Sequence, residues 1–184
     1  MDIIIELHAL TDTNTAIQLA NYIEDLNIMY YEEPVHPLNA VSMREIRENI
    51  NIPIAAGERI YTRLGYRPFL ENRSVNVIQP DVCLCGGISE TKKICDMADT
   101  YDAKVQVHVC GGPISTAAAL HVETVIPNFL IHEEHSYAIK EGLRATCKYD
   151  YLPEDGYLTV PELPGIGQEI TEETMKKTWV YSVK

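Results

Sequence analysis

The chain has 184 residues, of which 46% are hydrophobic and 23% are charged, and its formal net charge is −12 with a pI of about 4.8. This length and composition predict one soluble globular domain and exclude a disordered chain. The acidic charge and the absence of a long Lys/Arg block argue against a nucleic-acid-binding protein.

No stretch reaches the ~20 apolar residues of a membrane span, and the first residues lack the pattern of a signal peptide. We therefore expect a cytoplasmic protein without a membrane partner. Its five cysteines are an odd number in apolar surroundings, and we expect reduced thiols packed like small hydrophobic side chains.

Apolar runs rich in β-branched residues or Tyr alternate along the chain with segments of helical periodicity. The expected strands are residues 3–7, 28–32, 52–58, 75–81, 104–109 and 128–133. The expected helices between or after them are residues 13–26, 40–50, 63–72, 89–102 and 115–125. This alternation predicts a parallel sheet.

The starts of two helices carry recognisable signals. Thr13 or Asn14 can cap the first helix, and Ser89 follows a Gly-Gly turn at the start of another. The helix expected at 63–72 is less well supported, because Gly65 and Pro68 interrupt its pattern.

The last polar residue of each of the six expected strands is ionisable. These residues recur at intervals of 23 to 27 positions: Glu6, Glu32, Glu58, Asp81, His108 and Glu133. In a parallel barrel the carboxyl ends of all strands lie on one face, which is where such folds build active sites. An open doubly wound sheet would use only the strand ends beside its crevice. The six positions therefore favour a (β/α) barrel with one shared site.

Three of these residues suit a metal ion. The carboxylates of Glu6, Glu32 and Glu58 would repel one another in a partly buried pocket without a compensating cation. Ligands that offer only oxygen favour a hard divalent ion, and we expect Mg²⁺, which leaves positions for substrate oxygens. Arg59, beside Glu58, is expected to pair with a ligand carboxylate or to stabilise the strand end, and it is our candidate for contacting substrate.

Two histidines are candidates for proton transfer. His108 and Asp81 end neighbouring strands, and a carboxylate on one ring nitrogen would orient the imidazole and raise the basicity of the other nitrogen. His8 lies two residues after Glu6, so both side chains share a face if the strand continues. It is the candidate acid, with a loop histidine as the alternative.

Glu133 completes the candidate site. If it keeps a proton, it can donate a hydrogen bond to a developing oxyanion; the alternative is a structural carboxylate. His132 and Glu134 alternate with it along the chain and are expected to face outward. A metal flanked by two histidines suits abstraction of a proton α to a carboxylate, with loss of a β-hydroxyl as water.

Several stretches of the chain resemble the mandelate racemase branch of the enolase superfamily, in particular its acid-sugar dehydratases. They are ELH (6–8), YYEEP (30–34), IPIAAGER (52–59), VIQPDVCLCGGISE (77–90), VHVCGGP (107–113), NFLIHEE (128–134) and DGYLTVPELPGIGQEI (155–170). The resemblance covers nearly the whole chain. It implies an acid-sugar (aldonate or aldarate) substrate and a dehydration.

The resemblance also implies roles for individual residues. The positions that match the Mg²⁺ ligands are Glu6, Glu32 and Glu58, and those that match the base dyad are His108 and Asp81. Glu133 matches the residue that stabilises the enediolate, and His8 matches the acid that expels the hydroxyl. The first ligand is usually Asp in this family, and the longer side chain of Glu6 would shift its carboxylate by about 1.5 Å.

The resemblance implies six strand-helix units, which match strands three to eight of the family barrel. The N-terminal capping domain and the first two strands have no counterpart. We expect a partial TIM-type (β/α) barrel over residues 1–136 and, over residues 137–184, a segment that packs on the capping domain in relatives.

A barrel without two strands has open edges that invite pairing. The chain could be a fragment of a longer coding region, one part of a split enzyme, or a homo-oligomer. Two alternatives to a dehydratase also stand: a racemase or epimerase, and an inactive domain that associates with itself or with a partner chain.

Overall fold

The computed structural model describes residues 1–135, 140–179 and 181–182. Its centre is a parallel five-stranded sheet with the strands in chain order. The strands are β1 (Ile3–Glu6), β2 (Ile28–Glu32), β3 (Ile54–Ala56), β4 (Val77–Ile78) and β5 (Lys104–Val105). Each strand pairs with its predecessor, and a helix connects each pair.

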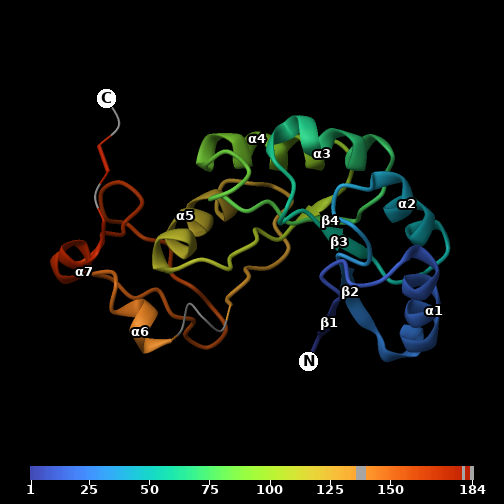
Figure 1. The fold of residues 1–184 in the computed structure, drawn as a ribbon, viewed down its shortest axis with the longest axis horizontal. Helices are drawn as coiled ribbons and strands as arrows, with labels where there is room; N and C mark the ends of the chain where they lie inside the picture. The colour runs from blue at the N-terminus through green and yellow to red at the C-terminus, as the bar shows by residue number, and fades with distance from the viewer. Residues whose placement is uncertain (136–139, 180, 183–184) are drawn as a thin grey trace.

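The helices form an arc around the strands (Figure 1). Those that follow the strands are α1 (Thr13–Ile23), α2 (Ala40–Glu48), α3 (Thr62–Glu71), α4 (Ile88–Asp99) and α5 (Pro113–Glu123). A short 3₁₀ helix, η1 (Glu24–Leu26), extends α1, while α6 (Glu141–Arg144) and α7 (Glu172–Lys177) lie in the C-terminal segment. This order is that of a (β/α) barrel.

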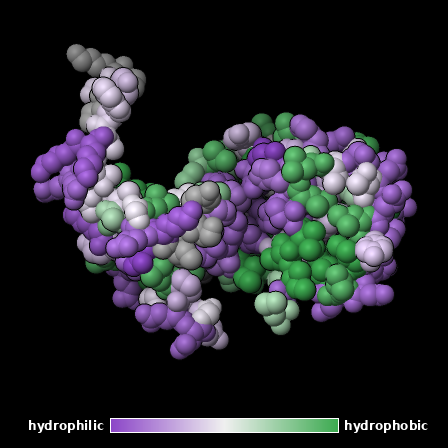
Figure 2. Space-filling model, turned by 60° about the horizontal axis from the view of Figure 1, so that its bottom comes forward, coloured by the Kyte–Doolittle hydropathy of each residue, from purple (hydrophilic) through white to green (hydrophobic). Residues whose placement is uncertain are grey.

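The barrel is partial, as the sequence predicts. Within the described residues no strand pairs with the outer edge of β1, so the sheet does not close. Ile3 and Ile4 of this edge strand are exposed, and Figure 2 shows a hydrophobic area on this side of the molecule. An open apolar strand edge is a surface suited to pairing.

The prediction of a sixth strand at residues 128–133 is wrong, because this segment forms no strand. Only Phe129 forms a parallel bridge, with Val105, through two backbone hydrogen bonds of 2.8 and 2.9 Å. The chain still follows the expected path beside β5. Because the described chain offers no partner on its outer side, hydrogen bonds to β5 alone hold this segment, and the ladder does not extend.

One expectation about helices needs correction, and another is confirmed. Asp12, rather than Thr13 or Asn14, caps α1, and its carboxylate accepts a 2.9 Å hydrogen bond from the Thr15 N–H. The weakly supported helix at 63–72 is present and continues through Pro68. A proline inside a helix costs about 3 kcal/mol, and burial of Phe69 and Leu70, at ~1.5–3 kcal/mol each, offsets it.

The two faces of the sheet bury different side chains. Tyr30 and Tyr31 are adjacent on β2 and both are fully buried. Tyr31 packs in the main core, and its hydroxyl donates a 3.2 Å hydrogen bond to the Ala16 carbonyl of α1. Tyr30 points to the opposite face and packs with Ala55 and Val77 in a smaller cluster inside the barrel.

Gly57 brings the end of β3 close to the next strand. Its φ is +152°, and a Cβ there would lie 2.6 Å from the Gln79 backbone nitrogen and 2.8 Å from the Tyr66 hydroxyl. Only glycine allows this approach, which places the following residue, Glu58, at the strand ends.

The C-terminal segment contains little regular structure. Antiparallel bridges join Cys147 to Ile170 and Glu154 to Tyr157, and the Ile166 carbonyl lies 3.2 Å from Nε2 of His121 on α5. The domain boundary expected at 136/137 lies outside the described residues. In the part of the chain that the structure describes, every helix is too short or too polar to cross a membrane.

All five cysteines are free. Cys85 and Cys95 are buried, as expected for thiols that pack like small hydrophobic side chains. Cys83 and Cys110 are exposed, which corrects that expectation for both. They follow strand ends and enter loops, so their apolar sequence neighbours do not cover them.

Candidate functional site at the strand ends

The ionisable residues predicted to end the strands lie together. Glu6 and Glu32 are direct partners in the register of β1 and β2. Asp81 and His108, which follow β4 and β5, form an isolated parallel bridge. Since all strands are parallel, these side chains share one end of the sheet.

His108 and Asp81 make the predicted contact. Nδ1 of His108 lies 2.7 Å from Oδ2 of Asp81, and both side chains are buried. The other oxygen of Asp81 accepts a 2.7 Å hydrogen bond from the Cys83 N–H. Asp81 is therefore fixed by its own turn and orients the imidazole so that Nε2 faces the site.

Nε2 of His108 also meets a carboxylate, 2.9 Å from Oε2 of Glu58. Burial acts to lower the pKa of His108, but the hydrogen bonds to Asp81 and Glu58 outweigh it and raise the pKa to about 11. The same contact lowers the pKa of Glu58. In this arrangement the imidazole carries a proton at neutral pH.

Glu6 and Glu32 are neighbouring carboxylates, and the pKa of each is raised. Burial raises the pKa of Glu32 to about 8, and the proximity of Glu6 contributes to this rise. Partial burial also raises the pKa of Glu6, against the hydrogen bonds from Glu32 and the His8 N–H. Two acids held this close favour a shared proton or a bound cation.

His8 lies among the carboxylates although β1 does not continue to it. The strand ends at Glu6, and His8 adopts a left-handed backbone with φ of +49°. Its Nδ1 is 3.4 Å from Oε1 of Glu58, 3.8 Å from Oε1 of Glu6 and 4.0 Å from Oε2 of Glu33. More than half of the His8 side chain is exposed, so it can exchange protons with solvent.

Glu33 is a residue of the site that was not predicted from the sequence. Its side chain is completely buried and forms a two-pronged ion pair with Arg59, whose Nε also lies 3.4 Å from Oε1 of Glu58. The Arg59 side chain remains 36% exposed. The contact of Arg59 with substrate stays a prediction. The doubled acid in YYEEP was the available signal for Glu33, since a charged residue directly after a buried strand end needs a partner.

Glu133 lies beside the segment that follows β5. Its Oε2 accepts hydrogen bonds from Nε2 of Gln106 at 3.1 Å and from the Val109 N–H at 3.0 Å. Neither Gln106 nor Gln79 was predicted from the sequence, although both are polar residues inside apolar strand runs. Gln79 is fully buried, and its side chain lies beside Glu32, where it acts to lower the pKa of that carboxylate.

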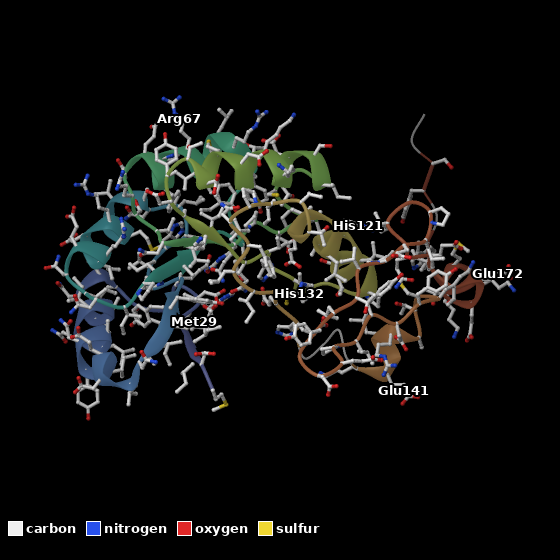
Figure 3. The ribbon with its side chains drawn as sticks, turned by 180° about the vertical axis from the view of Figure 1, so that it is seen from behind. Met29, Arg67, His121, His132, Glu141 and Glu172 are labelled. Carbon is white, nitrogen blue, oxygen red and sulfur yellow. The ribbon has the colours of Figure 1, made fainter. Side chains whose placement is uncertain are left out.

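His132 and Glu134 do not face outward, which corrects the expectation. They alternate away from Glu133, as expected, but the side chain of His132 is buried against α5 with Nδ1 2.7 Å from Oε2 of Glu123. Figure 3 shows His132 beside the α5 ribbon. Helix α5, rather than solvent, lies on this side of the segment after β5. The alternation of residues alone therefore could not show whether these side chains face solvent or are buried.

The donor set fits a hard divalent cation. Carboxylate oxygens dominate it, and neighbouring carboxylates in a partly buried site need a cation or a proton to offset their repulsion. Among the described residues, the group whose donor atoms all lie within 4.8 Å of one another is Glu6, His8 and Glu33. Of the three predicted ligands, this group contains only Glu6. Glu58 turns toward His108 instead. The assignment of Glu32 and Glu58 as ligands therefore stays a prediction.

Known proteins resemble this chain in sequence and in fold. Residues 1–174 match the family described as "Enolase C-terminal domain-like". The chain is 36% identical over 168 residues to the D-xylonate dehydratase of Haloferax volcanii, covering 90% of this chain and 40% of that protein. It is 34% identical over 174 residues to the D-galactonate dehydratase of Ralstonia pickettii, covering 91% and 45%.

A solved structure agrees in fold. The crystal structure of a member of the enolase superfamily from Salmonella Typhimurium superposes with a TM-score of 0.97 at 66% identity and covers all of this chain and 47% of that one. The chain thus spans less than half the length of these relatives.

Proposed function

The chain belongs to the enolase C-terminal domain-like family, and from this premise we propose that it carries the catalytic face of a Mg²⁺-dependent acid-sugar dehydratase. The observation that supports this best is the buried His108–Asp81 dyad, whose Nε2 points at the carboxylate cluster at 2.9 Å. The names of the two dehydratase relatives support the substrate class.

His108 is the proposed base. Asp81 holds Nδ1, so Nε2 is the nitrogen that removes the proton α to the substrate carboxylate. For this Nε2 must first lose its own proton, and release of Glu58 from Nε2 lowers the pKa of His108 toward the working range. The Cys83 N–H on Asp81 keeps the dyad in place while Glu58 moves.

Glu6, Glu32 and Glu58 are the proposed ligands of Mg²⁺. When bound, the ion would neutralise the carboxylate cluster and stabilise the negative charge that develops on the substrate carboxyl group. The ion pair between the buried Glu33 and the partly exposed Arg59 lies directly beside Glu58 and limits the positions that this carboxylate can take.

Glu133 and His8 are assigned the remaining roles. Glu133 donates a hydrogen bond to the enediolate when protonated. His8 gives its proton to the leaving β-hydroxyl, which departs as water, and the enol that remains becomes a 2-keto-3-deoxy acid. The exposure of His8 allows it to regain a proton from solvent. Arg59 is the proposed contact for the substrate.

A partner is proposed for the open side of the sheet. The edge of β1 is unpaired among the described residues, and its Ile3 and Ile4 are exposed. A second copy or a chain that carries the remaining barrel strands would cover this edge by β-pairing. We propose that residues 137–184 contact the capping portion of such an assembly.

The test is incubation of the protein with a panel of aldonic and aldaric acids and Mg²⁺, with detection of 2-keto-3-deoxy acids. The same samples in D₂O report exchange of the α-hydrogen by NMR. Product formation that is lost in His108→Ala supports the proposal. Deuterium exchange without loss of water indicates a racemase or epimerase instead, and absence of both reactions with every acid overturns the enzyme assignment for this chain.

A further inference from the structure

A chain of hydrogen bonds crosses the inside of the barrel and ends on Glu133. The Tyr30 hydroxyl on β2 donates to Oε1 of Gln106, which follows β5, and Nε2 of Gln106 donates to Oε2 of Glu133 at 3.1 Å. Tyr30 and Gln106 are buried to 1% and 3% exposure. The chain therefore links the second strand with the segment after the last one.

The direction of this chain is fixed at its Glu133 end, where the carboxylate oxygen Oε2 accepts from the Gln106 side chain. Tyr30 is a phenol, which can donate its O–H to the amide oxygen at the other end. A hydroxyl that donates to Gln106 selects the amide orientation with Oε1 toward Tyr30, and the NH₂ group then faces Glu133. The opposite orientation would place two oxygens against each other at Glu133.

The two oxygens of Glu133 are thereby made different. Oε2 already accepts two hydrogen bonds, from Gln106 and from the Val109 N–H at 3.0 Å. Within the described residues Oε1 has no such partner. A proton on this carboxyl group is therefore carried by Oε1, which is the oxygen left to donate to a substrate.

We propose that Tyr30 and Gln106 are positioning residues that hold Oε2 of Glu133, so that Oε1 is the oxygen left for the substrate. This inference rests on the proposed function for its catalytic meaning, while the placement of Glu133 can be tested without catalysis. Neither residue touches the reacting atoms in this assignment. Both act through Glu133.

The structure supplies a matched control. Tyr31 is adjacent to Tyr30, is equally buried, and donates its hydroxyl hydrogen bond to α1 on the other face of the sheet. Tyr30→Phe and Tyr31→Phe each remove one buried hydroxyl from the same strand. A purely structural effect would be shared by both variants, whereas an effect on Glu133 belongs to Tyr30 alone.

The first readout is the backbone amide of Val109 in ¹H–¹⁵N NMR spectra, because this N–H donates to Oε2 of Glu133. Glu133→Ala gives the reference spectrum without the acceptor. We expect the Val109 resonance of Tyr30→Phe and Gln106→Leu to move toward that reference and its hydrogen exchange to accelerate. In Tyr31→Phe it should stay at its wild-type position. Equal shifts in the two Tyr→Phe variants, or none in either, would overturn the inference.

The second readout is kinetic and uses the acid-sugar assay. Misplacing a catalytic group by a fraction of an ångström to 1 Å costs up to about 100-fold, so kcat should fall by about 10-fold or more in Tyr30→Phe and Gln106→Leu with KM nearly unchanged. Tyr31→Phe should keep its kcat. If the wild-type chain has no turnover, the proposed function fails, while the NMR result still decides whether Tyr30 and Gln106 position Glu133. An unchanged kcat together with a shifted Val109 resonance would contradict only the catalytic part of the inference.

Discussion

His108 lies 2.9 Å from Glu58 through Nε2, so the proposed base and a proposed metal ligand contact each other directly. This contact and the one with Asp81 keep the imidazole protonated at neutral pH. The arrangement couples the two halves of the site, because any group that draws Glu58 away also frees the nitrogen that is to act as base.

Asp81→Asn should impair proton abstraction without unfolding the chain. The amide keeps the size of the side chain but loses the charge that orients and stabilises the imidazolium, so the rate of α-hydrogen exchange should fall by about 10²- to 10⁴-fold. The measurement is deuterium incorporation by NMR with an acid sugar that the wild type turns over. Asp96→Asn, at an exposed residue paired with Lys92 on α4, is the matched control and should leave the rate unchanged.

Glu32→Gln should weaken Mg²⁺ binding by at least about 10-fold, because it removes a buried anionic ligand that costs energy to keep without a cation. Isothermal titration calorimetry with Mg²⁺ measures this change. Glu48→Gln alters an exposed carboxylate paired with Arg44 and should bind as the wild type does. Equal affinities of the two variants would remove Glu32 from the ligand set.

Arg59→Met should destabilise the fold by ~2–3 kcal/mol, since it leaves the fully buried Glu33 carboxylate without its cation. The partial exposure of Arg59 places the effect at the lower end for a broken buried pair. Arg67→Met breaks an exposed pair with Glu71 and should cost less than about 0.5 kcal/mol. Urea unfolding of both variants gives the comparison, and similar losses would show that water or another cation compensates Glu33.

The His132–Glu123 pair predicts how stability changes with pH. Burial acts to lower the pKa of His132, but hydrogen bonds to Glu123 and Glu134 raise it to about 9. A raised histidine pKa stabilises the folded state below the unfolded value of ~6.5, and this contribution is lost as pH rises through 9. The loss should reach up to about 3 kcal/mol.

Thermal unfolding of wild type and His132→Gln between pH 6 and 10 tests this. The stability difference between the two proteins should be largest near pH 6 and should shrink through pH 9. A constant difference between wild type and His132→Gln across the range would mean that His132 does not bind its proton more tightly in the folded state.

The free thiols predict a two-step reaction with a thiol reagent. Cys83 and Cys110 are exposed and should react in the native protein, whereas Cys85 and Cys95 are buried and should react only after unfolding. Burial raises the pKa of Cys95 to about 12, which keeps it as the unreactive thiol. Peptide mass mapping after brief labelling identifies the modified residues, and early labelling of Cys95 would contradict the packing around α4.

The sequence was sufficient for residues whose role follows from periodicity. The ionisable ends at Glu6, Glu32, Asp81 and His108 were predicted to share one end of a parallel sheet, and their register and bridges confirm this placement. It was insufficient at 128–133, where the ladder stops after Phe129, because strand length depends on a neighbour that the local pattern does not contain.

Residue spacing along the chain is enough to predict the partial barrel and the end of the sheet at which the site lies, because parallel strands of period two carry every terminal side chain to the same edge. The charges that meet there are known only from the folded chain: Glu58 with His108, Glu33 with Arg59, and Glu133 with Gln106 and, through it, Tyr30. These pairs join residues 26 to 76 positions apart. Their contacts depend on the curvature of the sheet and on burial, and neither is written in the spacing of residues along the chain.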